Sequence, residues 1–189
     1  MTRPATVGRD DRVRLFLALE LPDEVVDELR RWASRHITRG RPVDSFHVTL
    51  AFLGLQPRSA LAGIVDVLRR EARATEAFEL EIERYRETRS VGMLVLADRS
   101  GVATSLATRV QSGLEERGVY ERERRPWLAH VTVVRFRERP RLQPPLPETR
   151  TFVPSGAAAL LSRLHPSGAR YEVLESCSLR HGSTPPRRG

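Results

Sequence analysis

The chain has 189 residues and a mass of 21.4 kDa, which is enough for one or two compact domains with an apolar core. Its composition, 40% hydrophobic and 30% charged, excludes collagen-like and wholly disordered polymers. The formal net charge of +8 favours an anionic partner, such as a nucleic acid or a phosphorylated molecule. All 32 basic residues are arginine, however, and a GC-rich genome produces such a composition without selection for binding.

The sequence contains no segment typical of a membrane span or a signal peptide. Its longest apolar stretch near the N-terminus, residues 15–21, is short and contains Glu20. The single cysteine, Cys177, allows no intramolecular disulfide and suggests no thiolate metal site. We therefore expect a cytoplasmic protein with no membrane partner.

The charge and turn patterns divide the chain into three parts. Residues 1–11 are polar, and residues 181–189 end in a stretch rich in proline and arginine, so both are predicted to be flexible ends. Residues 12–180 are predicted to form the single folded domain between them.

The first half of this domain is predicted to contain alternating strands and helices. Strands are predicted at 14–21, at 46–53 with Gly54 ending the strand, and at 78–85, where apolar and acidic residues alternate. A first helix begins near Asp23, which is predicted to be its N-cap, and a second spans residues 59–74.

The second half repeats this order. A strand at 92–97 is followed by a helix at 102–117, which ends before Gly118, and by a strand at 128–136. A proline-rich turn at 140–147 precedes strands at 152–164 and 171–179, joined by a hairpin at 166–168. Each half thus gives strand, helix, strand, which predicts an internally duplicated α+β fold.

Two similar strings occupy matching places in these halves: His47-Val48-Thr49-Leu50 and His130-Val131-Thr132-Val133. Because side chains alternate along a strand, each His shares a face with the Thr two residues later, and the other two residues point to the core. The same alternation places the small residue Ala51 on the face of Thr49. A lone His in a strand is usually a structural residue, but two matched copies predict one shared site.

Other site chemistries find less support in the sequence. Two imidazoles could bind zinc, but no third ligand stands at a recognisable spacing, so we expect neither a metal nor a cofactor. The sequence contains no Gly-x-Ser-x-Gly string of a serine hydrolase and no glycine-rich nucleotide loop.

Two histidines without a metal suit displacement at phosphorus, because one imidazole can accept a proton while the other donates one. His47 and His130 are the candidate catalytic residues, and Thr49 and Thr132 are candidates to hold phosphate oxygens. The candidate cations are Arg135 and Arg137 after the second motif and Arg122, Arg124 and Arg125 before it.

Strict alternation places three further candidates on the wrong face. Arg135 would point away from His130 unless a bulge or strand end turns it back. Phe46 and Phe52 could stack on a base, but alternation places both opposite His47 and favours a core role.

The paired motifs resemble those of the 2H phosphoesterase superfamily, and within it the LigT-like RNA 2',3'-cyclic phosphodiesterases, also called the 2'-5' RNA ligase family. The resemblance rests on the opening segment 14–22, on the string 45–54 and on the string 130–135, and it covers roughly residues 13–180. It implies a bilobal α+β fold in which two lobes related by a pseudo-twofold axis, each with an antiparallel-rich sheet and outer helices, enclose a central cleft.

The resemblance also implies a function and its residues. The expected reaction is the opening of a 2',3'-cyclic phosphate on an RNA end or a small nucleotide to a 2'-phosphate, without a metal. His47 and His130 would be catalytic, and Thr49, Thr132 and Arg135 would bind the phosphate. Two alternatives remain open: an RNA-end binding module without turnover, and a ligase that runs the reaction in reverse. We expect a monomer, because one chain supplies both motifs.

Overall fold

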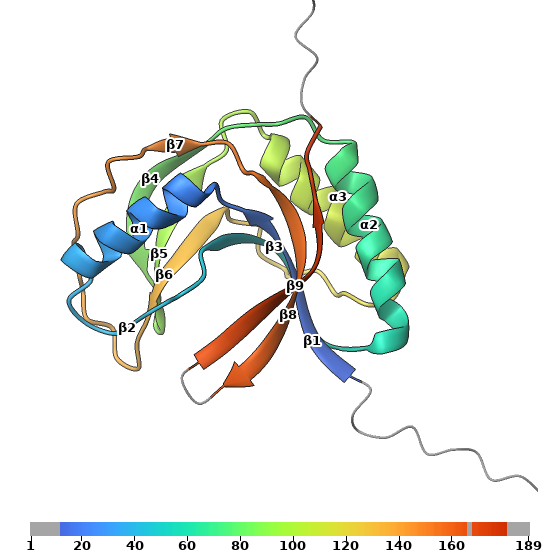
Figure 1. The fold of residues 1–189 in the computed structure, drawn as a ribbon, viewed down its shortest axis with the longest axis horizontal. Coiled ribbons are helices and arrows are strands. Elements are labelled where there is room, and N and C mark those ends of the chain that lie inside the picture. Colours follow the sequence, from blue (N-terminus) through green and yellow to red (C-terminus); the bar gives the residue numbers. More distant parts are fainter. Residues whose placement is uncertain (1–11, 166–167, 181–189) are drawn as a thin grey trace, which may run out of the picture.

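A computed structural model of the protein describes residues 12–165 and 168–180 (Figure 1). The predicted flexible ends, 1–11 and 181–189, and residues 166–167 of the predicted hairpin lie outside the described residues. The strands are β1 (Arg12–Glu20), β2 (Arg41–Pro42), β3 (His47–Pro57), β4 (Leu80–Glu87), β5 (Val91–Ala97), β6 (His130–Arg135), β7 (Thr151–Phe152), β8 (Gly156–His165) and β9 (Gly168–Cys177). The helices are α1 (Asp23–His36), α2 (Leu61–Arg73) after the short 3-10 turn η2 (Arg58–Ala60), and α3 (Val102–Glu116).

The strands form one sheet in the order β7-β4-β5-β6-β3-β1-β8-β9, with β2 added beside β6. All strand pairings in it are antiparallel. The sheet has two halves that meet where β3 pairs with β6, through the single residue pair Val48–Val131. The predicted α+β fold rich in antiparallel strands is therefore confirmed, and each half contributes one motif strand to the junction.

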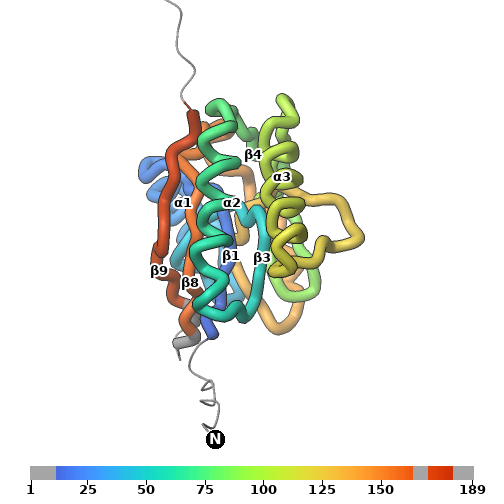
Figure 2. The backbone as a smooth tube through the Cα atoms, turned by 90° about the vertical axis from the view of Figure 1, so that its right-hand side faces the viewer, coloured from blue at the N-terminus to red at the C-terminus, as the bar shows by residue number. Residues whose placement is uncertain are grey.

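The helices cover the outer faces of the two halves. Helices α2 and α3 pack against each other, as Figure 2 shows, and contact β8, β9 and β3 of one half. Helix α1 is tied instead to the segment that leads to β7: the Trp32 indole donates to the carbonyl of Pro145, and the Glu28 carboxylate accepts from the amide of Thr149. The inner face between the halves is left for a site.

Strand β1 shows how the sequence divides between the two faces of the sheet. Its residues Leu15, Leu17 and Leu19 belong to the main core under the helices. The alternate residues Phe16 and Ala18 form a small second cluster with Ala158 and Leu160 of β8 on the other face. Five successive residues of β1 are therefore buried, because both faces of this strand are covered.

Several predicted element boundaries were wrong in detail. Asp23 is the first residue of α1, not its cap, because Pro22 occupies the cap position and its carbonyl accepts the first helical hydrogen bonds. Strand β3 continues past Gly54 to Pro57, since that glycine adopts a positive φ within the strand. The predicted strand at 152–164 divides into β7 and β8. The short strand β2 was not predicted.

No helix in the part of the chain that the structure describes is long and apolar enough to cross a membrane.

Candidate active site

The two motifs meet at the junction between the halves. Val48 and Val131 are pair partners and are almost fully buried in the core, at 0% and 1% exposure. The antiparallel register around this pair places His47 opposite Thr132, and Thr49 opposite His130. All four of these side chains are half-buried and share the inner face of the sheet.

His47 stands in an aromatic corner of this face. Its ring centroid lies 4.8 Å from that of Phe16 and 5.4 Å from that of Tyr171, whose ring meets it edge-on at 88°. Its Nδ1 atom is buried and has no hydrogen-bond partner among the described residues. The pKa of His47 is lowered from 6.5 to about 4, mainly by burial and then by the charges of His130 and Arg135. The imidazole is therefore neutral at pH 7.

The His130 ring is oriented by a hydrogen bond to the backbone just before strand β6. Its Nδ1 atom lies 2.9 Å from the carbonyl oxygen of Leu128, so Nδ1 carries the proton and donates this bond. In the neutral ring this tautomer leaves the lone pair on Nε2. Nε2 is the nitrogen that can exchange a proton with a bound molecule.

A bulge in β6 turns Arg135 toward the site. In the pairing with β5, Gly92 stands opposite Val134 and Met93 opposite Thr132, so Val133 is an extra residue. Val133 and Val134 are consequently both buried in the core, and Arg135 follows on the exposed side. Its charge also contributes to the lowered pKa of His47. Strict alternation alone would put Arg135 on the opposite face, and this bulge is the exception that the sequence analysis allowed for.

A similar bulge in β3 exchanges the predicted places of Ala51 and Phe52. Leu17 and Ala18 of β1 pair with Ala51 and Thr49, which leaves Leu50 as the extra residue. Ala51 is buried in the core instead of lying on the face of Thr49. Phe52 is 53% exposed, and its ring centroid lies 6.4 Å from that of Phe16, so it is on the inner face. Phe46 is buried in the core, as predicted.

Two side chains from the second half satisfy backbone carbonyls at the β3 bulge. The Trp127 indole donates to the carbonyl of Thr49 at 2.9 Å. The Gln111 amide, from α3, donates to the carbonyl of Leu50 at 2.9 Å. Because a bulge removes ladder hydrogen bonds, these donors replace them and fix the backbone that carries Thr49.

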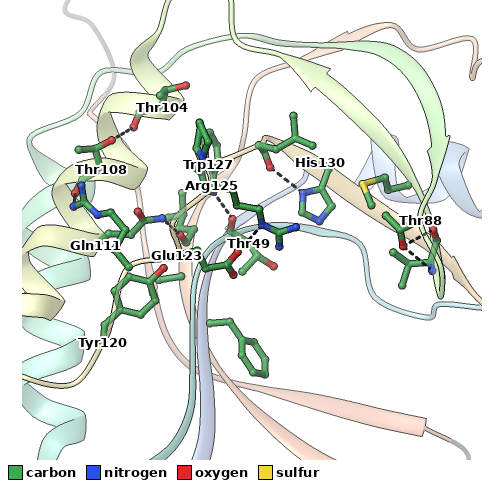
Figure 3. A pocket seen from close by; sticks show the side chains of 18 of the residues that line it. Thr49, Thr88, Thr104, Thr108, Gln111, Tyr120, Glu123, Arg125, Trp127 and His130 are labelled. Atoms are coloured by element: carbon green, nitrogen blue, oxygen red, sulfur yellow. Dashed lines mark hydrogen bonds and ion pairs between the residues drawn. The ribbon is translucent and has the colours of Figure 1, made fainter.

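A pocket of about 720 Å³ opens beside the junction, between α3, the segment 119–129 and the ends of β3, β4 and β5. Figure 3 shows Thr49 and His130 at this pocket together with Tyr120 and Trp127. His47, Thr132 and Arg135 do not line it. Of the other predicted cations, Arg122 and Arg125 line the pocket, whereas Arg124 and Arg137 do not.

Sequence reasoning missed the residues that surround His47 and several that line the pocket, among them Tyr120 and Trp127. Phe16 and Tyr171 come from β1 and β9, which lie far from the motif in sequence, and no local pattern links them to it. Trp127 could have been suspected from the sequence, because it stands only three residues before the motif residue His130. A pattern of alternating residues does not reveal a side chain that donates across the junction.

The described residues contain no group of three His, Cys, Asp or Glu side chains that could hold a metal ion. The arrangement offers two imidazoles, two hydroxyls and a guanidinium on one face. Such a set can hold an anion and move a proton to and from it.

Comparison with known proteins identifies the family of this chain. The family model described as the 2'-5' RNA ligase superfamily matches residues 20–165. An RNA 2',3'-cyclic phosphodiesterase of Thermus thermophilus is 29% identical over 191 residues, covering 90% of this chain and 93% of that protein. A protein of the same name from Escherichia coli is 29% identical over 132 residues, covering 65% and 71% of the two chains.

Solved structures show the same fold. The TT0787 protein of Thermus thermophilus superposes with a TM-score of 0.76 at 28% identity, covering 90% of this chain and all of that one. Escherichia coli LigT in its apo form gives a TM-score of 0.76 at 24% identity, covering 90% and 99%. Fold and paired motifs together define a phosphoesterase of the two-histidine type. The chain belongs to the 2'-5' RNA ligase superfamily.

Proposed function

We propose that this protein hydrolyses the 2',3'-cyclic phosphate at the end of an RNA or of a small nucleotide and leaves a 2'-phosphate, without a metal. The observation that supports this proposal most is the facing of the two motifs across the Val48–Val131 pair. It puts His47 opposite Thr132, and Thr49 opposite His130, on two adjacent strands. The relatives named RNA 2',3'-cyclic phosphodiesterases support the same reaction.

The proposed reaction is an in-line displacement at phosphorus. One imidazole takes a proton from water while the water oxygen forms a new bond to phosphorus. The bond between phosphorus and the 3' oxygen breaks, and the other imidazole gives that oxygen its proton. The products are a 2'-phosphate and a free 3'-hydroxyl, so atoms and protons balance. Nε2 of His130 is available for this exchange because Nδ1 is engaged with Leu128.

The remaining site residues stabilise the charge that builds up on phosphate. Thr49 and Thr132 flank the junction and can each donate a hydroxyl hydrogen bond to a non-bridging oxygen. Arg135, turned inward by the bulge, supplies the positive charge. Donors arranged in advance around the phosphate favour the transition state, where the charge on these oxygens is greatest.

His47 starts the cycle neutral, because its pKa is about 4. A bound phosphate places negative charge beside the ring and favours the imidazolium. Binding of substrate therefore brings His47 toward the range in which a proton can be exchanged near neutral pH.

The substrate is proposed to be a nucleotide because of the aromatic side chain beside the reacting position. Phe52 is exposed on the inner face, where a base can stack on it. Escherichia coli LigT, which shares the fold, has been solved with 3'-AMP and with NADP+. We further expect the protein to act as a monomer, since one chain supplies both motifs. We also expect it to act in the cytoplasm.

The test is hydrolysis of a nucleoside 2',3'-cyclic phosphate in the presence of EDTA, with the products separated as 2'- and 3'-phosphates. The proposal predicts turnover that chelator does not reduce and a 2'-phosphate product. Binding of the cyclic phosphate without turnover would favour the RNA-end binding module. A 3'-phosphate product, or activity lost in EDTA and restored by a divalent ion, would contradict the proposal.

A further inference from the structure

The pocket between α3 and the segment 119–129 extends away from the reacting position. Of the five candidate site residues, only Thr49 and His130 line it, so the pocket reaches beyond the reacting position. A volume of about 720 Å³ lies in the upper half of the usual range for ligand sites, roughly 300–1,000 Å³. The pocket therefore has room for more than the phosphate and the sugar that carries it.

The lining of this pocket combines aromatic rings with cations. Phe52, Tyr120 and Trp127 line it, although the whole chain has only six Phe, three Tyr and two Trp. Three arginines line it as well, Arg86, Arg122 and Arg125, against the single carboxylate of Glu123. Rings that stack on bases, together with cations that attract phosphates, are the combination that binds single-stranded nucleic acid.

The charges of the pocket favour an anionic group in addition to the reacting phosphate. Arg122 pairs with Glu115, and Arg125 pairs with Glu123, so both are partly neutralised. Arg86, an exposed residue of β4 at the pocket, forms no ion pair among the described residues. A lone base offers such a cation no negative charge, whereas the phosphodiester on the 5' side of the terminal nucleotide does.

The segment that closes the pocket is held in place at both of its ends. The amide of Gln56 donates to the carbonyl of Val119, and the guanidinium of Arg122 donates to the hydroxyl of Ser112 on α3. The Trp127 indole fixes the other end to β3. A pocket held in this way needs little ordering when a ligand binds.

We propose that this pocket binds the nucleotide that precedes the cyclic phosphate, so that the preferred substrate is an RNA end and not a mononucleotide. The proposal rests on the proposed function for the reacting group. In it, Tyr120 provides a stacking surface for the preceding base, and Arg86 faces the phosphodiester between the two nucleotides.

The experiment compares two substrates with the same reacting group: a nucleoside 2',3'-cyclic phosphate and a dinucleotide that ends in the same cyclic phosphate. The value measured is the ratio of kcat/KM for the dinucleotide to kcat/KM for the mononucleotide. For the wild type we expect a ratio of about 10 or more, since each stacked base is worth roughly 5- to 150-fold in binding. A ratio near one would overturn the proposal.

Variants locate the effect in the pocket. Tyr120→Leu should bring the ratio close to one without changing mononucleotide turnover, whereas Tyr120→Phe keeps the ring and the ratio. Arg86→Gln should lower the ratio roughly 2- to 5-fold at low salt, and less at high salt. The control is Arg84→Gln, which removes an exposed arginine of the same strand that does not line the pocket. Equal losses on both substrates would assign the pocket to the terminal base and overturn the proposal.

A binding measurement separates this inference from the proposed reaction. Calorimetry with the 2'-phosphorylated dinucleotide and with the 2'-phosphorylated mononucleotide needs no turnover. Tighter binding of the dinucleotide, lost in Tyr120→Leu and kept in Tyr120→Phe, would support the pocket even if neither cyclic phosphate is hydrolysed. Equal affinity for both ligands would overturn it.

Discussion

His47, the histidine of the first motif, lies in an environment very different from water. Its ring is packed against Phe16 and Tyr171 and faces the charges of His130 and Arg135, which together hold its pKa near 4. Burial of an imidazole favours its neutral form, and a nearby anion favours its charged form. The proton on His47 is therefore controlled by what binds in the site.

The first prediction concerns this proton. Addition of a nucleoside 2'-monophosphate should raise the pKa of His47 by about one unit or more, because the phosphate stabilises the imidazolium. The measurement is an NMR titration of the imidazole resonances with and without the ligand, assigned with a His47→Gln variant. An unchanged pKa in the ligand-bound protein would contradict the placement of phosphate beside this ring.

The same burial predicts how stability depends on pH. The pKa of His47 is about 4 in the folded protein and near 6.5 in the unfolded chain, so only the unfolded chain takes up this proton between these values. The contribution of His47 to stability should be constant above pH 6.5 and fall by about 3 kcal/mol as the pH drops to 4. Denaturant unfolding of wild type and His47→Gln across this range measures the difference. His36→Gln, on α1, should behave as the wild type.

At the scale of elements, the bulges decide which side chains reach the site. Hydrophobic periodicity predicts the strands and helices, because it reflects the faces that are buried. It does not predict an extra residue in a strand, since Leu50 and Val133 are ordinary core residues in sequence. Alternation consequently placed Arg135 and Phe52 on the wrong face, although it was right for both His-x-Thr pairs, which precede the bulges.

The β3 bulge gives a prediction about the two tryptophans. Each indole donates one hydrogen bond to a backbone carbonyl, Trp127 to Thr49 in the site and Trp32 to Pro145 far from it. Replacement of either by Phe should lower the free energy of unfolding by about 1–2 kcal/mol. Only Trp127→Phe should also lower kcat/KM on a cyclic mononucleotide, by roughly ten-fold, because it frees the backbone that carries Thr49. Equal activity of both variants would show that this hydrogen bond does not position the site.

At the scale of the molecule, the repeat in the sequence already indicates a site made by two halves. Matching strings at matching positions predict that the two motifs face each other. The order of the strands, and the contacts of Tyr171 and Phe16 with His47, depend on pairings between distant segments that carry no local signal. The sequence therefore predicts the meeting of the two motifs better than it predicts what surrounds them.

The two halves of the sheet are joined through one residue pair, and the candidate site contains residues from both halves. Val48 and Val131 hold the two motifs together, and each half supplies one imidazole and one hydroxyl. A reaction that needs one proton acceptor and one proton donor cannot proceed with a single half. The two histidines should act as a unit, so that the second loss adds little once the first is gone.

The most direct test of this account is the turnover of a nucleoside 2',3'-cyclic phosphate by wild type, His47→Ala, His130→Ala and the double variant, each shown to be folded and assayed in EDTA. We predict that each single substitution lowers kcat by roughly 10²–10⁴-fold, and that the double variant is about as slow as either single one. A single variant that keeps the wild-type rate, or two losses that multiply in the double variant, would contradict a paired-histidine mechanism.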